Sequence, residues 1–243
     1  MVKTVVVPDV HVPFEHKAHV RRMLKYIKEE KPKKIVMLGD VLDFHALTYH
    51  RKQKDWRDRL LEEVSAGRKF LQSIRRSAGN SAEIIFIEGN HEDRWNRYVE
   101  QRAPHLADLQ HSHWSSHLAL EQFGIELASG AVRTKAGAGQ TVRFLHGHEV
   151  KGSSRIAGNH ALNCARKLGE NVHCGHTHRL GVLCATVGGK TLFGVEGGWL
   201  GDWTSPATKY IGIARPDWRV AFAVYDSKNK TSPFPKMIMA PND

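Results

Sequence analysis

The chain contains the run Ile84-Ile85-Phe86-Ile87-Glu88, followed directly by Gly89-Asn90-His91-Glu92. The apolar run has the length and the branched side chains of a buried strand, and the polar block begins where it ends. Four more apolar runs end in the same way. They lead into Asp9-Val10-His11, Gly39-Asp40-Val41-Leu42-Asp43, His146-Gly147-His148 and Gly175-His176-Thr177-His178. Because ligands bind beyond the carboxyl ends of the strands in open α/β sheets, we expect the five blocks to converge on one rim.

The first half of the chain alternates strands with helices. We expect strands at about residues 4–8, 35–38 and 83–87, and helices at about 16–30, 55–77 and 92–122. Such alternation favours an α/β fold with mostly parallel central strands. After residue 125 the runs become shorter and Gly-rich turns separate them. A helix at about 155–168, a hairpin at Gly188-Gly189 and a late strand at 218–225 are predicted there. We expect two mixed β-sheets, packed face to face and flanked by helices, in a single domain spanning residues 1–243.

The composition is that of a globular protein, with 41% hydrophobic residues and no apolar stretch near the roughly 20 residues that span a bilayer. The first strand is expected at about residue 4, which argues against a signal peptide. The three cysteines form no C-x-x-C pair and are expected to be reduced thiols, with Cys174 and Cys184 as small buried hydrophobes. We therefore expect a cytoplasmic protein without a membrane partner.

Basic residues outnumber acidic ones by 36 to 25, which gives a net charge of +11 and an isoelectric point near 9.7. This excess favours polyanionic partners, of which nucleic acid is the commonest. Residues 51–76 alone carry nine basic against four acidic residues, together with Trp56, and start just after the second polar block. They form either a cationic stacking surface for nucleic acid or a solvated helix face.

The five blocks deliver side chains that ligate metal ions. Asp9 and His11 are two residues apart, as are His176 and His178, so in extended backbone each pair would point to one side. With Asp40, Asn90 and His146 they make seven candidate ligands, which suits two ions rather than one. A shared carboxylate can bridge two ions about 3.5–4 Å apart.

The charge of these ligands favours phosphate chemistry. Asp9 and Asp40 are the anionic members, so two divalent ions would leave the site positive by about two units. A cationic open site suits a phosphate ester and activates water as a nucleophile. Oxygen and imidazole ligands suit Mn, Fe, Zn, Co or Ni better than Ca, and Mn is the ion we expect.

In this order and spacing, the five blocks resemble those of the calcineurin-like metallophosphoesterases, from residue 9 to residue 178. The resemblance implies a four-layer sandwich and a dinuclear metal-dependent phosphoesterase. It implies in-line attack on phosphorus by a metal-bridging hydroxide.

The resemblance also implies a role for each matching residue. One ion would be held by Asp9, His11 and His178, the other by Asn90, His146 and His176, with Asp40 bridging them. His91 would face the phosphate, either donating a proton to the leaving oxygen or stabilising charge, and Asp43 would orient His91 through a hydrogen bond. His148 is the alternative to His146 as the ligand of the fourth block.

Three residues are candidates for binding the substrate: Arg51, Arg94 and His148. Phe44 and His45 follow Asp43 where the protein phosphatases of this family have Arg and Gly, which weakens a phosphoprotein substrate. Glu196-Gly197-Gly198-Trp199 resembles the turn that closes the family's active-site rim. The histidines at 105, 111, 113 and 117 follow no strand, and we expect surface or packing roles for them.

The excess of basic over acidic residues favours a phosphodiesterase acting on nucleic acid or nucleotides, similar to the nuclease branch of the family. The alternative is a phosphomonoesterase or small-nucleotide phosphatase. A catalytically inactive scaffold with the same fold is a third possibility, which the complete ligand set disfavours. The sequence does not distinguish DNA from RNA, and it does not indicate an oligomeric state.

Overall fold

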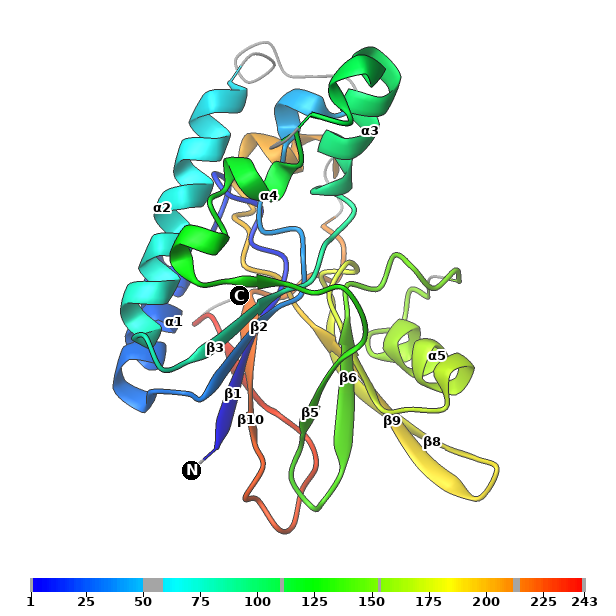
Figure 1. Cartoon of the computed structure of the whole chain (residues 1–243). Coiled ribbons are helices and arrows are strands. Elements are labelled where there is room, and N and C mark those ends of the chain that lie inside the picture. Colours follow the sequence, from blue (N-terminus) through cyan, green and yellow to red (C-terminus); the bar gives the residue numbers. More distant parts are fainter. Residues whose placement is uncertain (1, 50–58, 110–111, 153, 212–214, 242–243) are drawn as a thin grey trace.

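The computed structural model describes residues 2–49, 59–109, 112–152, 154–211 and 215–241, which form two β-sheets with helices on both outer faces (Figure 1). The predicted α/β class with two packed mixed sheets is therefore confirmed. The basic residues at 51–57, Arg51 among them, and Trp56 lie outside the described residues.

The first sheet has the strand order β11-β10-β1-β2-β3-β4. Its strands are β1 (Lys3–Val7), β2 (Lys34–Met37), β3 (Glu83–Phe86), β4 (Glu126–Leu127), β10 (Ala221–Asp226) and β11 (Lys236–Met239). The four strands from β1 to β4 are parallel, whereas β10 and β11 are each antiparallel to their neighbour. Helices α1 (Lys17–Glu30) and α2 (Leu60–Ala78) make the crossovers between the parallel strands.

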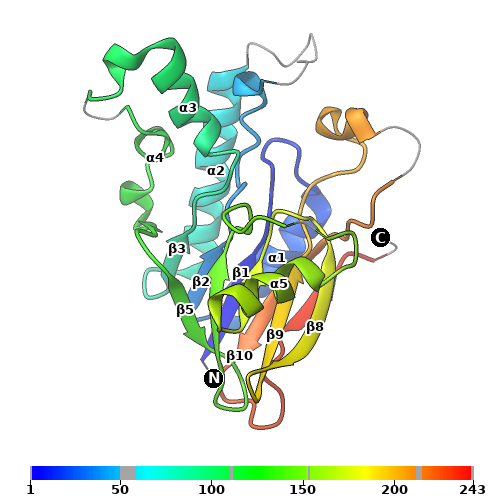
Figure 2. The ribbon, with the colours of Figure 1, turned by 90° about the vertical axis from the view of Figure 1, so that its right-hand side faces the viewer.

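The second sheet has the order β5-β6-β7-β9-β8. Its strands are β5 (Val132–Lys135), β6 (Thr141–Leu145), β7 (Val172–Cys174), β8 (Leu180–Val187) and β9 (Lys190–Gly197). The central strands β6, β7 and β9 are parallel, and the edge strands β5 and β8 are antiparallel to them. Helix α5 (Asn159–Leu168) covers the outer face of this sheet (Figure 2).

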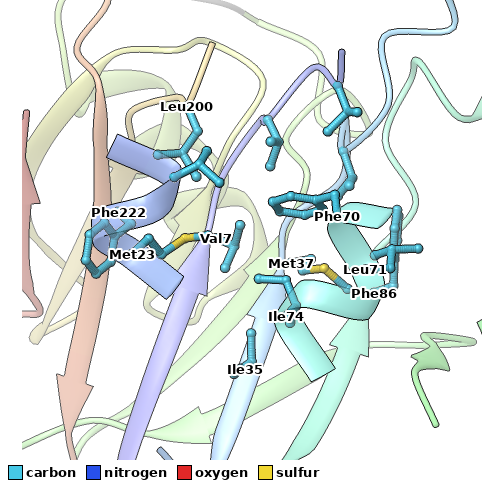
Figure 3. Packing of buried hydrophobic residues seen from close by; sticks show 14 of the residues in the cluster. Val7, Met23, Ile35, Met37, Phe70, Leu71, Ile74, Phe86, Leu200 and Phe222 are labelled. Carbon is cyan, nitrogen blue, oxygen red and sulfur yellow. The ribbon is translucent and has the colours of Figure 1, made fainter. Parts of the chain in front are cut away.

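Side chains along the strands of the first sheet alternate between two cores, as the two-residue period of a strand requires. In β2, Ile35 and Met37 join the core under α1 and α2, while Val36 faces the second sheet. Figure 3 shows the first of these cores, where α1 contributes Met23 and α2 contributes Phe70. Because both faces are covered, the central strands are apolar on both faces after their first one or two residues.

The region predicted as one helix at 92–122 is broken into short pieces. It contains α3 (Asp93–Arg102), η2 (Pro104–Leu106), α4 (Trp114–His117) and η3 (Glu121–Phe123). Helix α3 stops because Ala103 precedes Pro104, and proline disfavours helical geometry in the residue before it; Ala103 has φ −149° and ψ 55°, outside the helical region.

Other predicted boundaries shift by a few residues. Helix α5 begins at Asn159 rather than 155, because Gly158 before it takes a left-handed φ of 83°. Strand β10 begins at Ala221 rather than 218. Helix α2 begins at Leu60; the part of its predicted range before residue 59 is not described.

The predicted hairpin at Gly188-Gly189 is confirmed. Val187 pairs with Lys190, and both glycines have positive φ (55° and 78°), which suits a tight two-residue hairpin turn. The prediction for Cys184 on β8 is wrong. Its side chain is exposed because β8 is an edge strand, whereas Cys174 is buried as expected.

No helix within the described residues combines the length and the apolar character needed to span a membrane.

The fold predicts a specific effect at Gly194 on β9. A Cβ at this position would overlap the backbone of Ala161 and Leu162 in α5. We expect Gly194→Ala to lower the free energy of unfolding by about 1–3 kcal/mol, as overpacking does. In Gly130→Ala the added Cβ meets no atom within 4 Å, so the change should stay below about 1 kcal/mol. Urea unfolding followed by circular dichroism measures both, and equal stabilities would contradict the close contact between α5 and β9.

Candidate metal centre

The polar blocks lie at the carboxyl ends of β1, β2, β3, β6 and β7, where the chain turns sharply. His11, Asp40, His176 and His178 have φ between 49° and 66°, in the left-handed region that non-glycine residues seldom adopt. The prediction of extended backbone at His11, His176 and His178 is therefore wrong. Strain of this kind is concentrated at functional sites, where surrounding contacts hold it in place.

Three groups of side chains at this rim each offer ligand atoms within 4.8 Å of one another. The groups are Asp9, His11 and His178; His11, Asp40 and His91; and Asp40, His146 and His176. Because they share His11 and Asp40, they form one continuous cluster.

In the first group the ring nitrogens Nε2 of His11 and His178 lie 3.0 Å apart, and His178 Nε2 lies 3.5 Å from Asp9 Oδ1. His11 donates from Nδ1 to Asp43 Oδ2 at 3.1 Å, so Nε2 of a neutral ring carries only a lone pair. Asp9 Oδ2 is buried without a hydrogen-bond partner. An unpartnered buried carboxylate oxygen beside imidazole lone pairs fits a cation.

The third group shows the same arrangement. His146 donates from Nδ1 to the carbonyl oxygen of Leu38 at 2.8 Å, which leaves Nε2 facing Asn90 Oδ1 at 3.0 Å and Asp40 Oδ2 at 3.4 Å. A neutral His146 would therefore place three acceptor atoms together. A proton or a metal ion between them removes that conflict, so Asn90 adds an oxygen ligand to the group.

The charges of this group shift its pKa values. Burial opposes the charged form, yet the Asp40 carboxylate raises the pKa of His146 to about 10. Burial also opposes ionisation of Asp40, but the positive charge of His146 and the hydrogen bond with it hold the pKa of that carboxyl well below its usual range. A metal ion bound here would displace the proton from His146, so binding would release protons.

His91 lies over the same cluster, with its ring 4.6 Å from that of His11. Its Nδ1 donates to the carbonyl oxygen of Asp43 at 2.8 Å, and its Nε2 accepts from Arg94 Nη2 at 2.9 Å. The predicted contact between Asp43 and His91 thus runs through the main chain, because the Asp43 carboxylate accepts from His11 instead. Burial lowers the pKa of His91 to about 3, with the positive Arg94 adding to the effect and Asp40 opposing it.

Of the residues predicted to bind the substrate, Arg94 contacts this cluster and His148 lies at its edge. Arg94 also donates from Nη1 to the Asp43 carbonyl oxygen at 2.8 Å, so it contacts both residues expected to be catalytic. His148 is exposed at the edge, with its ring 5.2 Å from that of His146 and 6.2 Å from that of His176. His146 is buried and contacts Asp40, whereas His148 is not part of any ligand group among the described residues. Arg51 lies outside the described residues.

Three buried glutamates received no role of their own from the sequence, although Glu92 and Glu196 lie in quoted motifs. Glu92 accepts hydrogen bonds from the backbone N–H groups of Asp40, Val41, Leu42 and Gly89 at 2.8–3.1 Å. Glu63 accepts from those of His45 and Ala46, and Glu196 from those of Gly158 and His160. Glu92 thus fixes the turn that carries Asp40, whereas Glu63 fixes the segment after Asp43 and Glu196 fixes the start of α5. Burial raises the pKa of Glu92 and of Glu63 to about 7, and in each case a nearby aspartate adds to the effect.

A sequence pattern could have revealed Glu63. It lies four residues before Gly67 and seven before Phe70, on the buried stripe of α2. An acidic residue on such a stripe indicates a buried carboxylate with hydrogen-bond partners.

Aromatic side chains line one side of the cluster. Trp199 stacks on His178 with ring centroids 5.1 Å apart and an angle of 14°, and Trp218 meets His178 edge-on at 4.3 Å. Trp199 is buried. The predicted rim turn at residues 196–199 is therefore packed against a candidate ligand.

Where they are described, the histidines after α3 lie either in local contacts or on the surface. His113 accepts at the start of α4, and the ring of His117 lies 4.5 Å from that of Trp95. His105 is exposed, and residue 111 is not described.

A family model of calcineurin-like phosphoesterases matches residues 2–180. The chain therefore belongs to the calcineurin-like phosphoesterase family, and membership supports metal-dependent hydrolysis of phosphoesters in general. The family implies a dinuclear divalent metal centre, and the His and Asp groups at the rim are candidates for its ligands.

Two phage proteins are similar to this chain over most of their length. The chain is 26% identical to the Gene 54 protein of Mycobacterium phage L5 and 25% identical to that of Mycobacterium phage D29. Each comparison covers 91% of this chain and 88% of the phage protein.

Among solved structures, the chain is similar to Vps29 of Entamoeba histolytica complexed with zinc, with a TM-score of 0.45 and 13% identity over 98% of this chain and 99% of that one. It is also similar to the nuclease MPE of Pseudomonas putida, with a TM-score of 0.38 and 15% identity over 96% and 87%.

The hydrogen bonds of Glu92 predict a large loss of stability in Glu92→Gln. The amide side chain would turn N–H donors toward backbone N–H groups, leaving at least one of them unpaired. We expect the free energy of unfolding to fall by about 2–4 kcal/mol. Urea unfolding measures this, with Glu126→Gln as the control, because Glu126 on β4 is exposed. A loss no greater than that of the control would contradict the role assigned to Glu92.

Proposed function

We propose that this chain hydrolyses phosphodiester bonds of nucleic acid or nucleotides, using two divalent transition-metal ions. One observation carries the proposal. Seven candidate oxygen and imidazole ligands from five separate strand ends lie at one rim, with Asp40 in two of the three groups of His and Asp side chains and Asn90 beside His146. The network of acceptor atoms around His146 supports a cation there. We take the ions to be manganese, and a cytoplasmic location is consistent with three free cysteines.

The proposed ligands fall into two sets that share Asp40. Asp9, His11 and His178 would hold one ion, and Asn90, His146 and His176 the other. Ions held in this way supply a nucleophile by lowering the pKa of bound water, and they neutralise phosphoryl oxygens. The two carboxylates among seven ligands leave the site cationic, which favours an anionic substrate.

Residues of the chain itself would orient the substrate beside these ligands. His91 and Arg94 hydrogen-bond to each other, so a phosphate reaching the cluster would meet an imidazole and a guanidinium together. In the hydrogen-bonding pattern of the structure His91 Nε2 accepts from Arg94 and Nδ1 carries the proton. We therefore propose that the pair stabilises phosphoryl charge, with Arg94 supplying the N–H donors.

Two features support a nucleic acid or nucleotide over a monoester substrate. The net charge of +11 favours a polyanion. Trp218, which is partly exposed beside His178, offers a surface on which a base can stack. His148, which is exposed, and Arg51, which lies outside the described residues, complete the proposed substrate contacts.

Hydrolysis of two matched chromogenic esters tests the proposed function. Metal-stripped protein should be inactive, and added Mn²⁺ should restore hydrolysis of bis(p-nitrophenyl) phosphate, at least tenfold faster than hydrolysis of p-nitrophenyl phosphate. The comparison uses kcat/KM at equal metal concentration. A preference for the monoester would assign the protein to the phosphomonoesterases, and activity that survives chelation would contradict the metal centre.

The variant His91→Asn separates metal binding from turnover. It should keep the metal content of the wild type, because His91 lies outside both proposed ligand sets, and it should lose about 10²–10⁴-fold in kcat. Elemental analysis and steady-state kinetics measure the two quantities. His105→Asn, at an exposed histidine, is the matched control. Turnover within a factor of three of the wild type would rule out the proposed role.

A further inference from the structure

A row of three tryptophan side chains extends away from the candidate metal centre. Trp203 stacks on Trp218 with ring centroids 5.4 Å apart and an angle of 25°, and it meets Trp199 edge-on at 5.3 Å. Trp218 and Trp199 both contact His178. The three tryptophans thus form a continuous aromatic wall from a proposed ligand to Trp203.

A cavity of about 220 Å³ lies at the far end of this wall. It is lined by Trp203, Lys209 and Arg215 and by the hydroxyl residues Thr204, Ser205 and Thr208. Pockets for drug-sized ligands measure roughly 300–1,000 Å³, so this cavity has room for one ring system rather than a large ligand. The short helix η4 (Pro206–Ile211) supplies part of its lining and stands at the same end of the molecule as α3 (Figures 1 and 2).

Unsatisfied polar atoms mark the cavity and the wall. Ser205 is 8% exposed, and its Oγ has no hydrogen-bond partner. Trp199 is 3% exposed, and its Nε1 also has no partner. Buried polar atoms are normally hydrogen-bonded, so the Ser205 hydroxyl keeps an unused donor and acceptor, which a ligand in the cavity can reach after the hydroxyl changes rotamer.

The charge of the cavity is positive. The guanidinium carbon of Arg215 lies 5.3 Å from the ring centroid of Trp203, and Lys209 is exposed beside it. The described residues that line the cavity include no carboxylate. Asp202, the nearest acidic residue in sequence, accepts from the backbone N–H and the hydroxyl of Thr204. An aromatic floor, two cations and a free hydroxyl together suit a flat base attached to a phosphate.

We infer that this cavity binds the nucleobase next to the scissile phosphate of a single-stranded nucleic acid. The base stacks on Trp203 in the place that the Arg215 guanidinium occupies in the structure. Arg215 moves aside and contacts the flanking phosphate together with Lys209, and the Ser205 hydroxyl turns toward the cavity and hydrogen-bonds to the edge of the base. The inference rests on the proposed function and names the substrate more closely. A phosphodiester without a base would reach the metal centre but leave the cavity empty.

Equilibrium binding to two strands of equal charge tests the inference. The probes are a six-nucleotide single-stranded DNA and the same backbone without bases, each titrated into metal-free protein in EDTA while tryptophan fluorescence is followed. The wild type should bind the strand with bases roughly 5- to 100-fold more tightly, as expected for one stacked base. Trp203→Leu should remove most of that preference. Binding of a dinucleotide with the same dependence on Trp203 would also support the site.

Arg215→Gln provides a second variant at an exposed position, in case Trp203→Leu fails to fold. It should weaken binding of both strands and reduce the slope of log affinity against log salt by about one. Lys230→Gln is its control, because Lys230 is exposed and follows β10 at the opposite end of the first sheet from the rim. Equal affinity of the wild type for the two strands would overturn the inference, as would an Arg215→Gln variant that matches the control.

The chromogenic diester contains no nucleobase and keeps the two proposals separable. A wild type that cleaves it but shows no preference for bases would contradict the base-binding cavity alone. A wild type that prefers bases but cleaves no diester would contradict the proposed function alone.

Discussion

The carboxylate of Glu92 holds together the two turns on which the candidate centre is built. Its two oxygens accept four backbone N–H groups, three from the turn after β2 and one from Gly89 after β3. Without it these buried donors would be unpaired, which costs about 1–3 kcal/mol for each group. Asp40 extends the network by accepting from the N–H of His91, and Asp9 does the same for His176. The acidic side chains therefore join turns that are far apart in the sequence, and the ligand positions depend on them.

The same network explains why two positions of the motifs, 89 and 175, are glycines. A Cβ on Gly89 would overlap the carboxylate and the backbone nitrogen of Asp40, and a Cβ on Gly175 would overlap Asp9 Oδ2. Each turn must approach an aspartate of another strand so closely that only glycine fits. Gly89 and Gly175 are thus as much part of the centre as the histidines that follow them.

The strands and the rim could be predicted from the sequence because both depend on local patterns. Apolar runs such as 84–87 have the length of buried strands, and each ends at a polar block. The left-handed backbone of His11 and His176 could not be predicted, because it is imposed by contacts with distant strands. The hydrogen bond from His91 to the carbonyl oxygen of Asp43, rather than to its carboxylate, depends on where His11 lies. The tryptophan wall joins residues near 199 and 218 to a histidine at 178, which no local pattern reveals.

The central claim is that Asp40 joins two ion sites at this rim. Anomalous X-ray diffraction from crystals loaded with Mn²⁺ tests it most directly. We predict two peaks about 3.5–4 Å apart, one beside Asp9 and His178 and one beside His146 and His176, with the Asp40 carboxylate between them. A single peak, or two peaks that do not share Asp40, would contradict it.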